Sequence, residues 1–223
     1  MSQARSLVVF GASETAELAD YYFTLDQGRS AAAFVLDDEF AGTSSAFGRP
    51  VVARSELREA FPPSSTDFFA AIAYRDMNAI RRDRVRWARE AGYGLASYVS
   101  PRACVFPNAQ IGEHCFILEN NVVQPFVQIR DNAMLWSGNH IGHHSVIGED
   151  VFLASHVVVS GNCTVGAGSF LGVNATIRDG VTLGERTLVG AGALVLRDTQ
   201  DEAVLAGAGT RVASTRSSEI PVI

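Results

Sequence analysis

The stretch that decides the fold runs from residue 141 to residue 177 and reads IGHHSVIGEDVFLASHVVVSGNCTVGAGSFLGVNATI. Every sixth residue in it is aliphatic, and the same spacing continues in both directions. The aliphatic positions are Val105, Ile111, Ile117, Val123, Ile129, Leu135, Ile141, Ile147, Leu153, Val159, Val165, Leu171, Ile177, Leu183, Val189 and Val195. Aliphatic residues make up roughly a quarter of an average chain, so chance does not produce such a run.

A second column of mostly small or compact residues lies four positions after each aliphatic residue. A six-residue unit with one large and one small inward residue predicts a parallel β-helix. Three units close one triangular coil, and the coils stack at roughly the 4.8 Å spacing of neighbouring strands. No coil is stable alone, because each buries its aliphatic column against the next. Asn121 and Asn139 fall on inward positions, where stacked amides bonding along the axis would satisfy them.

Residues 6–100 follow a different pattern, in which short apolar runs alternate with amphipathic segments. Ser13 is a possible N-cap for the first of these segments. We expect strands at 6–12, 30–38 and 66–74, and helices at 14–25, 55–61 and 78–93. Strands separated by helices indicate an α/β domain with a parallel sheet of the mononucleotide-binding, half-Rossmann kind. The predicted division is an α/β domain at 1–100, a β-helix at 101–212 and a C-terminal tail at 213–223.

Composition narrows the class of protein. The net charge of −6 argues against a nucleic-acid partner, because such proteins normally carry a basic face. No apolar run approaches the roughly 20 residues that span a bilayer, and the first residues do not resemble a signal peptide. Cys104, Cys115 and Cys163 form neither a disulfide framework nor a CxxC metal pattern. We therefore expect a cytoplasmic protein without membrane insertion.

The five histidines are His114, His140, His143, His144 and His156. None of them falls on an inward position of the six-residue repeat, so all should point outward or lie at corners. A step of eighteen residues places Gly161 next to His143, where the missing side chain would leave room for a bound chain. An imidazole is the usual group for taking a proton at neutral pH, so His143 is a candidate general base.

Several segments occur in the order seen in two-domain sugar acyltransferases with hexapeptide repeats. They are VVFGASETAE, FVLDD, TDFFAAIAY, YVSPRA, HIGHHSVIG, SGNCTVG, FLGVNATI and VLAGAG. The chain resembles the branch that acetylates nucleotide-linked amino sugars such as bacillosamine precursors, together with proteins called sialic acid O-acetyltransferases. The resemblance covers almost the whole chain. It implies a left-handed β-helix, a homotrimer and acetyl-CoA as the acyl donor, without a metal.

The resemblance also implies roles for single residues. The family's catalytic histidine, in an I-x-H-x-x-V-I-G context, is matched by His143, whereas the next position is commonly acidic and here is His144. The residues expected at acetyl-CoA are Gly161, Gly172, Gly190, Arg197 and Arg211. The residues expected at the acceptor are Gly11, Ala12, Ser13, Asp37, Asp38, Asn139 and His140. For the two arginines we favour the alternative that they are solvated surface charges. Glu14 in the first loop would repel a diphosphate.

These observations favour an acetyl-CoA-dependent acetyltransferase that acts on a nucleotide-linked amino sugar. The backbone N–H near Gly161 is a candidate oxyanion donor, by analogy. Acetylation of a sugar hydroxyl is the first alternative. A zinc enzyme like the β-helical carbonic anhydrases, with His140, His143 and His144 as ligands, is a second. A non-catalytic hexapeptide scaffold is a third.

Overall fold

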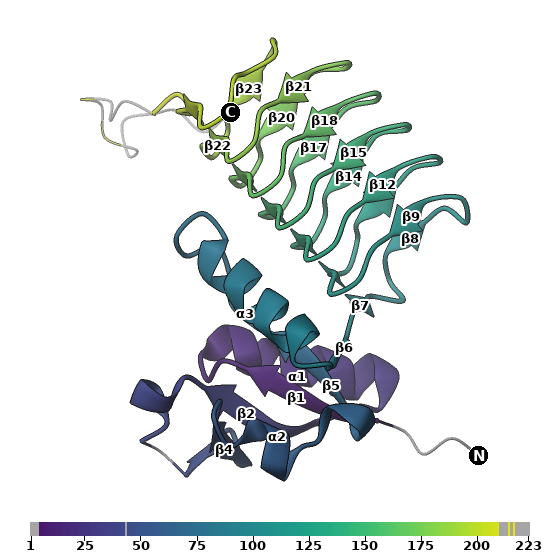
Figure 1. Ribbon diagram of the computed structural model, residues 1–223. Helices are drawn as coiled ribbons and strands as arrows, with labels where there is room; N and C mark the ends of the chain where they lie inside the picture. Colours follow the sequence, from purple (N-terminus) through teal and green to yellow (C-terminus); the bar gives the residue numbers. More distant parts are fainter. Residues whose placement is uncertain (1–4, 43, 210–213, 215, 217–223) are drawn as a thin grey trace.

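The computed structural model describes residues 5–42 and 44–209, together with residues 214 and 216. An α/β domain packs against the early coils of a stack of triangular coils, and the last described coil lies far from it (Figure 1). The predicted combination of an α/β domain and a parallel β-helix is confirmed. Strand β7 (Tyr98–Val99) already pairs within the β-helix, so the coils begin a few residues before the expected division after residue 100.

The α/β domain is built on a mainly parallel sheet with the strand order β3-β4-β2-β1-β5-β6. Its elements are β1 (Ser6–Phe10), α1 (Glu14–Gln27), β2 (Ala31–Leu36), the 3-10 turn η1 (Asp38–Phe40), β3 (Ser45–Ala46), β4 (Arg49–Ala53), α2 (Leu57–Ala60), η2 (Pro63–Ser65), β5 (Thr66–Ala70), α3 (Ala79–Glu90) and β6 (Gly94–Leu95). Only β3 runs antiparallel to its neighbour within the described sheet. The short strands β3, β4 and β6 were not predicted.

Helix α1 shows how local sequence directs the chain back to the sheet. Ser13 takes the extended N-cap conformation, and its carbonyl accepts the N–H groups of Ala16 and Glu17. The Ser13 side chain makes no capping hydrogen bond. Gly28 ends the helix in the left-handed region at φ 64° and donates to the carbonyl of Thr24. A glycine adopts this conformation without steric cost, which allows β2 to start three residues later.

The β-helix has three faces in the described part of the chain. The first face holds β7, β10 (Phe116–Ile117), β13 (Met134–Leu135), β16 (Phe152–Leu153), β19 (Phe170–Leu171), β22 (Leu188–Val189) and β24 (Val204–Leu205). The second face holds β8 (Cys104–Val105), β11 (Val122–Val123), β14 (His140–Ile141), β17 (Val158–Val159), β20 (Thr176–Ile177) and β23 (Leu194–Val195). The third face holds β9 (Gln110–Ile111), β12 (Gln128–Ile129), β15 (Val146–Ile147), β18 (Thr164–Val165) and β21 (Thr182–Leu183).

Strand register confirms the predicted eighteen-residue coil. Val123 pairs with Ile141, and Ile141 pairs with Val159 one coil further on. The aliphatic column forms the continuous core of the prism. The last coil is shorter, because Val189 pairs with Leu205 rather than with a residue eighteen positions later.

The buried amides of the second column behave differently from the prediction. The Asn121 amide donates to the carbonyls of Leu118 and Trp136, and the Asn139 amide also donates to Trp136. The Asn139 side-chain oxygen accepts the backbone N–H of Val157, one coil further on. These amides therefore link coils through backbone groups and do not bond to each other. The prediction of an amide-to-amide stack was wrong.

One left-handed residue marks each corner in most of the described β-helix. Residues with positive φ recur every sixth position at His114, Asn120, Phe126, Asn132, Gly138, His144, Asp150, His156, Asn162, Gly168, Asn174, Gly180, Arg186 and Gly192. Asn, Asp and His are the non-glycine residues most often found in this region. His114, His144 and His156 therefore occupy positions where the backbone itself favours such a residue.

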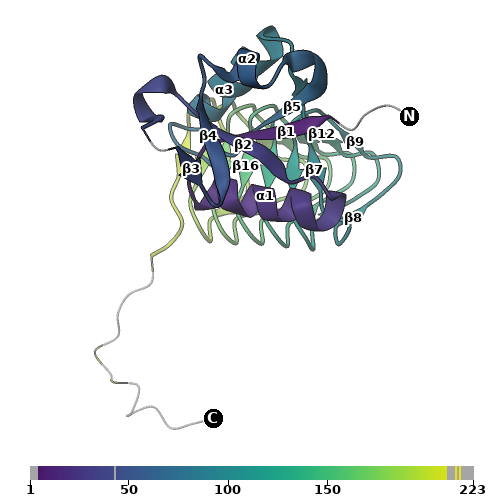
Figure 2. The same cartoon turned by 90° about the horizontal axis from the view of Figure 1, so that it is seen from below.

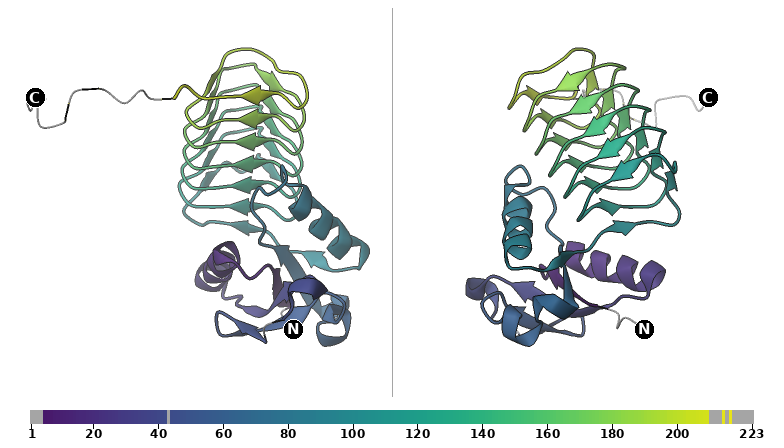
Figure 3. Two further views of the ribbon diagram at one scale, coloured as in Figure 1. Left: turned by 90° about the vertical axis from the view of Figure 1, so that its left-hand side faces the viewer. Right: turned by 45° about the vertical axis from the view of Figure 1, so that its right-hand side comes forward.

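The α/β domain covers the first face of the prism. Phe116, Met134 and Phe152 on that face share one buried core with Phe23 and Phe69 of the α/β domain. Figure 2, seen from below, shows α1 lying across the coils, and both views of Figure 3 place the α/β domain beside the early coils. The corner between the second and third faces is therefore opposite the covered face.

A buried polar cluster fixes helix α3 to the corner between the third and first faces. The fully buried Arg81 guanidinium donates to Asn132 Oδ1 at 3.1 Å and to the carbonyl of Asp150 at 2.9 Å. His114 Nε2 accepts the N–H of Ala70 at 2.8 Å, and His114 Nδ1 lies 2.9 Å from Asn132 Oδ1. Burial, reinforced by the charge of Arg81, lowers the pKa of His114 to about 3.

The position of His114 corrects one prediction. Its side chain leaves the prism at a corner, as expected, but the α/β domain buries it completely. The six-residue register describes only what lies inside the prism and says nothing of a second domain outside it. No helix among the described residues is long and apolar enough to cross a membrane.

Candidate active site

Two exposed histidines lie together at the corner between the second and third faces. The Nδ1 atoms of His143 and His144 are 3.2 Å apart. Gln124, one coil earlier, accepts the backbone N–H of His143 at 2.8 Å. The ring of Phe126, also one coil earlier, lies 4.6 Å from the His144 ring between centroids. The preceding coil therefore holds the backbone of His143 and packs against the ring of His144.

The contact between the two Nδ1 atoms relates the tautomers of the two rings. Only one of the two nitrogens can donate in a hydrogen bond, and the other must accept. When His143 Nδ1 donates, His143 Nε2 keeps a free lone pair and can take a proton from a substrate. In this arrangement His144 accepts at Nδ1, which is the function that a carboxylate would serve in its place.

Gly161 lies directly beside the His143 ring. A Cβ placed on Gly161 would be 2.8 Å from Cε1 and 2.9 Å from Nε2 of His143. The space left by the missing side chain is thus filled by the imidazole, and the expected room for a bound chain is not there. The N–H of Gly161 has no acceptor among the described residues, so it remains a possible oxyanion donor.

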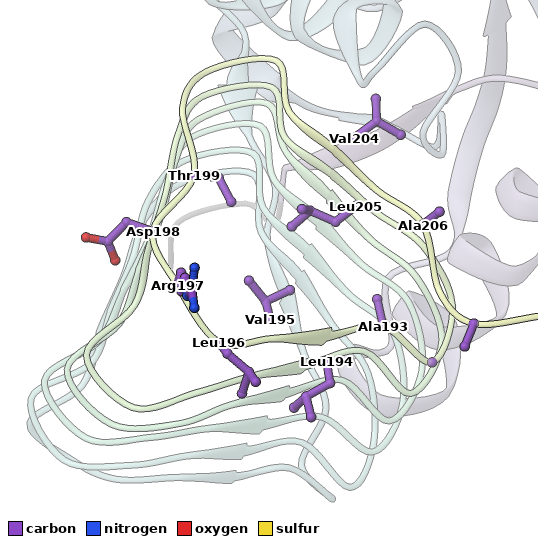
Figure 4. A pocket seen from close by; sticks show the side chains of 12 residues that line it. Ala193, Leu194, Val195, Leu196, Arg197, Asp198, Thr199, Val204, Leu205 and Ala206 are labelled. Atoms are coloured by element: carbon purple, nitrogen blue, oxygen red, sulfur yellow. The ribbon is translucent and has the colours of Figure 1, made fainter.

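The column of residues above His143 continues with Gly161, Asp179 and Arg197 at eighteen-residue steps. At roughly 4.8 Å per coil, Arg197 stands about 14 Å from His143 along the axis. Arg197 is exposed and pairs with no carboxylate of the described chain. It also lines the open end of the prism, a hollow of about 790 Å³ into which Val195 and Leu205 project (Figure 4). Arg211 lies outside the described residues.

Gly172 and Gly190 lie at another corner, between the first and second faces. A Cβ on Gly172 would come within 2.6 Å of the backbone nitrogen of Ala191, and one on Gly190 within 2.9 Å of that of Gly207. Close stacking of successive coils therefore accounts for both glycines. Because Gly161 lies at a different corner, the three glycines do not line one surface of a single chain, and their expected place at acetyl-CoA stays a prediction.

A second candidate site is a cavity of about 610 Å³ in the α/β domain, at the carboxyl ends of β1, β2 and β5. Its lining includes the predicted residues Gly11, Ala12, Ser13 and Asp37. Ligands of open parallel sheets commonly bind at this edge. Glu14, which was expected to repel a diphosphate, does not line the cavity.

The lining of this cavity carries charges of both signs, from Arg75 and Arg84 and from Asp37, Glu39 and Asp83. Arg84 is 2.5 Å from Asp37 Oδ2, and Arg54 is 3.2 Å from Asp37 Oδ1. The buried Asp37 Oδ1 nevertheless makes no hydrogen bond within the described chain, because the contact with Arg54 is an ion pair without hydrogen-bond geometry. Both carboxylate oxygens of Asp37 thus face an arginine, and the negative charge of Asp37 is balanced within the chain.

Three predicted acceptor residues lie elsewhere. Asp38 is outside the cavity and accepts hydrogen bonds from the hydroxyl and backbone N–H of Ser55. Asn139 is buried inside the prism, where a substrate cannot reach it. His140 projects from the second face between Val122 and Val158, half-buried and away from the cavity. Among the described residues, no three His, Cys, Asp or Glu side chains gather as a metal site.

Several residues of the two sites were missed by sequence analysis. Asp179 could have been found, because it lies two coils after His143. Gln124 and Phe126 flank the position one coil before His143, so the same step could have pointed to them as well. No sequence signal could have found Arg75 and Arg84, because their place depends on how the chain around α3 packs against the sheet.

Comparison with known proteins places these features in context. The family model described as bacterial transferase hexapeptide (six repeats) matches residues 126–161 and 162–197. No curated protein matches the chain. PerB from Caulobacter crescentus, solved in complex with CoA and GDP-perosamine, is 29% identical at a TM-score of 0.79, and the match covers 89% of this chain and 92% of that chain.

Two further solved structures show the same architecture. The acetyltransferase domain of PglB from Neisseria gonorrhoeae, in complex with acetyl coenzyme A, is 26% identical at a TM-score of 0.81 and covers 92% of this chain and 97% of that chain. A variant of perosamine N-acetyltransferase from Caulobacter crescentus, with one histidine replaced by asparagine, binds CoA and GDP-perosamine. It is 27% identical at a TM-score of 0.72, with 91% and 93% of the two chains covered.

Proposed function

The chain belongs to the hexapeptide-repeat family of bacterial transferases, with a left-handed β-helix, and from this premise we propose that it acetylates a nucleotide-linked amino sugar. Acetyl-CoA would be the donor. The observation that carries this proposal is the exposed His143–His144 pair at a coil corner, in a chain whose other domain offers a nucleotide-sized cavity. Relatives of the same two-domain architecture were solved with CoA and GDP-perosamine or with acetyl coenzyme A.

In this proposal His143 is the general base and His144 its positioning residue. The amine nitrogen attacks the thioester carbonyl while His143 Nε2 takes one of its protons. The tetrahedral oxyanion would be met by the free N–H of Gly161. When the intermediate collapses, the carbon–sulfur bond breaks and the sulfur of CoA takes the proton from His143. His144 Nδ1 accepts a hydrogen bond from the Nδ1–H of His143 throughout, which stabilises the imidazolium formed during attack.

The two predicted domains would have different roles, with residues 1–100 holding the acceptor and residues 101–212 supplying the catalytic surface. The predicted tail at 213–223 lies outside the described residues, apart from residues 214 and 216. The diphosphate would lie at Gly11–Ser13, near the start of α1, with Arg75 and Arg84 balancing its charge. Asp37, which lines the cavity, would accept a ribose hydroxyl, as an acidic residue after the second strand does in related folds. Acetyl-CoA would follow the column from His143 to Arg197.

We also propose a homotrimer, because one chain alone does not bring its two sites together. The cavity belongs to the domain on the first face, whereas His143 lies at the opposite corner of the prism. An acceptor held by one copy therefore needs the His143 corner of another copy. We infer a cytoplasmic location from the three free cysteines, Cys104, Cys115 and Cys163, which suit a reducing compartment.

The test is acetyl transfer from acetyl-CoA to a panel of nucleotide-linked 3- and 4-amino sugars that includes GDP-perosamine. His143→Ala should lower kcat by roughly a hundredfold to ten-thousandfold, the usual contribution of a general base. Millimolar acetyl-CoA should still raise the melting temperature of this variant, because binding to the folded state stabilises it. His144→Ala should cost less than His143→Ala. Wild-type protein that neither gains stability from acetyl-CoA nor acetylates any member of the panel would refute the function.

A further inference from the structure

We propose that Asp179 binds the acceptor amine together with His143, and that this pair makes the site select an amine over a hydroxyl. The inference rests on the proposed function, since it concerns the acceptor of that reaction. Asp179 lies at the same corner as His143, two coils further along the β-helix. Its carboxylate and the His143 ring both lie close to Gly161, whose coil stands between theirs.

The separation of the two groups follows from their distances to one point. A Cβ on Gly161 would be 2.9 Å from Asp179 Oδ1 and 2.9 Å from His143 Nε2. These two atoms form no ion pair in the structure, so they are more than about 4 Å apart. Because each is 2.9 Å from the same point, they are at most about 6 Å apart. A tetrahedral nitrogen that donates two hydrogen bonds of about 2.9 Å holds its acceptors about 4.7 Å apart. One amine nitrogen therefore fits between them.

The same geometry disfavours a hydroxyl acceptor. A hydroxyl has one proton and can donate to His143 or to Asp179, but not to both. If it donates to the base, its oxygen faces the Asp179 carboxylate with a lone pair. An amine has enough N–H groups for both acceptors, and its protonated form is also attracted by the negative charge.

The Asp179 carboxylate is free to serve a ligand. It is exposed, and it makes no hydrogen bond or ion pair with any residue in the described part of the chain. Asp198, in the next coil, differs because its Oδ1 accepts the backbone N–H of Thr182 and so holds the corner together. Asp131 likewise accepts the N–H of Glu113. Asp179 has no such structural duty in the fold.

The protons balance with Asp179 ionised throughout. The acceptor arrives as an ammonium ion, which is the form that the carboxylate attracts. It loses one proton to water before attack, and the neutral amine stays hydrogen-bonded to both groups. His143 takes the second proton as the nitrogen–carbon bond forms and passes it to the sulfur of CoA. The net products are the amide, CoA with its thiol, and one proton.

The experiment measures kcat and KM of Asp179→Asn with the best amino-sugar acceptor of the panel, such as GDP-perosamine. A charge-assisted hydrogen bond is strong enough that its loss should lower kcat/KM for the amine roughly tenfold to a hundredfold. Glu149→Gln is the matched control, since it removes one exposed carboxylate from a different corner of the same β-helix. This control should leave kcat/KM unchanged.

A second arm uses the same nucleotide sugar with a hydroxyl in place of the amine. Its turnover should be barely detectable in the wild type and should not fall in Asp179→Asn, so the preference for amine over hydroxyl should shrink. Unchanged kcat/KM for the amine, or an equal fall for both acceptors, would overturn the role of Asp179. Acetyl-CoA should stabilise wild type and variant alike, and failure of that readout in the wild type would count against the proposed function instead.

Discussion

Lowering the pH should loosen the contact between the two domains through His114. The structure keeps this imidazole neutral, because burial and the charge of Arg81 lower its pKa to about 3, whereas a histidine in the unfolded chain has a pKa near 6.5. Below about pH 6.5 the unfolded chain therefore binds a proton that the folded chain does not. The stability contributed by neutral His114 is complete above that pH and is lost as the pH falls toward 3.

The size of the effect follows from this difference in pKa. Each pH unit below about 6.5 costs about 1.4 kcal/mol, so at about pH 5 the free energy of unfolding should be lower by about 2 kcal/mol. Asp150, in the same cluster, has the opposite effect, because burial raises its pKa and favours the folded protein in acid. The contribution of His114 must therefore be measured as a difference between two proteins.

The comparison is wild type against His114→Gln, which keeps an acceptor for the Ala70 N–H and a donor for Asn132 but does not titrate. Urea unfolding at about pH 7.5 and about pH 5, at one protein concentration, gives the loss for each protein. Wild type should lose about 2 kcal/mol more than the variant over this interval. Equal losses in the two proteins would show that His114 is not held neutral, and the reasoning from its burial would fail.

Two further predictions concern the candidate sites. Gly161→Ala should push the His143 ring aside, because the new methyl group would lie under 3 Å from it. This variant should lose at least tenfold in kcat, while circular dichroism shows an unchanged fold. Full activity would mean that the ring does not occupy that space during the reaction. Arg84→Ala should weaken binding of GDP about tenfold in calorimetry, because it removes a cation from the cavity and leaves Asp37 with less charge compensation. Arg186→Ala, at a distant position, serves as the control. Equal affinity of the wild type and both variants would exclude the cavity as the nucleotide site.

The β-helix could be predicted in detail because its code is local and repeated. Each aliphatic position, such as Ile141 or Val159, carries the same information about which side faces inward. The eighteen-residue step then also places Gly161 against His143 without any knowledge of the rest of the fold. A repeat thus turns sequence distance into spatial distance, which ordinary globular folds do not allow.

The predictions from sequence were wrong where the α/β domain covers the β-helix, or where a side chain binds the backbone of a neighbouring coil instead of a ligand. His114 is outward by register and yet buried, because the α/β domain covers that corner. Asn139 matched a substrate-binding expectation but serves the backbone of the neighbouring coil. Asp38 turns to Ser55, and only packing around α3 brings Arg84 to Asp37. None of these contacts has a fixed offset in sequence, so no periodicity could reveal them.

The constant spacing of the coils fixes distances along the axis of the β-helix. Each coil after His143 adds one strand spacing along the axis of the β-helix. The distance from His143 to Arg197 is therefore fixed by the number of coils between them. Deleting one complete coil between them would shorten that distance by about 4.8 Å and leave every corner intact. Descendants of this chain could thus be matched to longer or shorter ligands by the gain or loss of entire turns, while the base and its neighbour stay untouched.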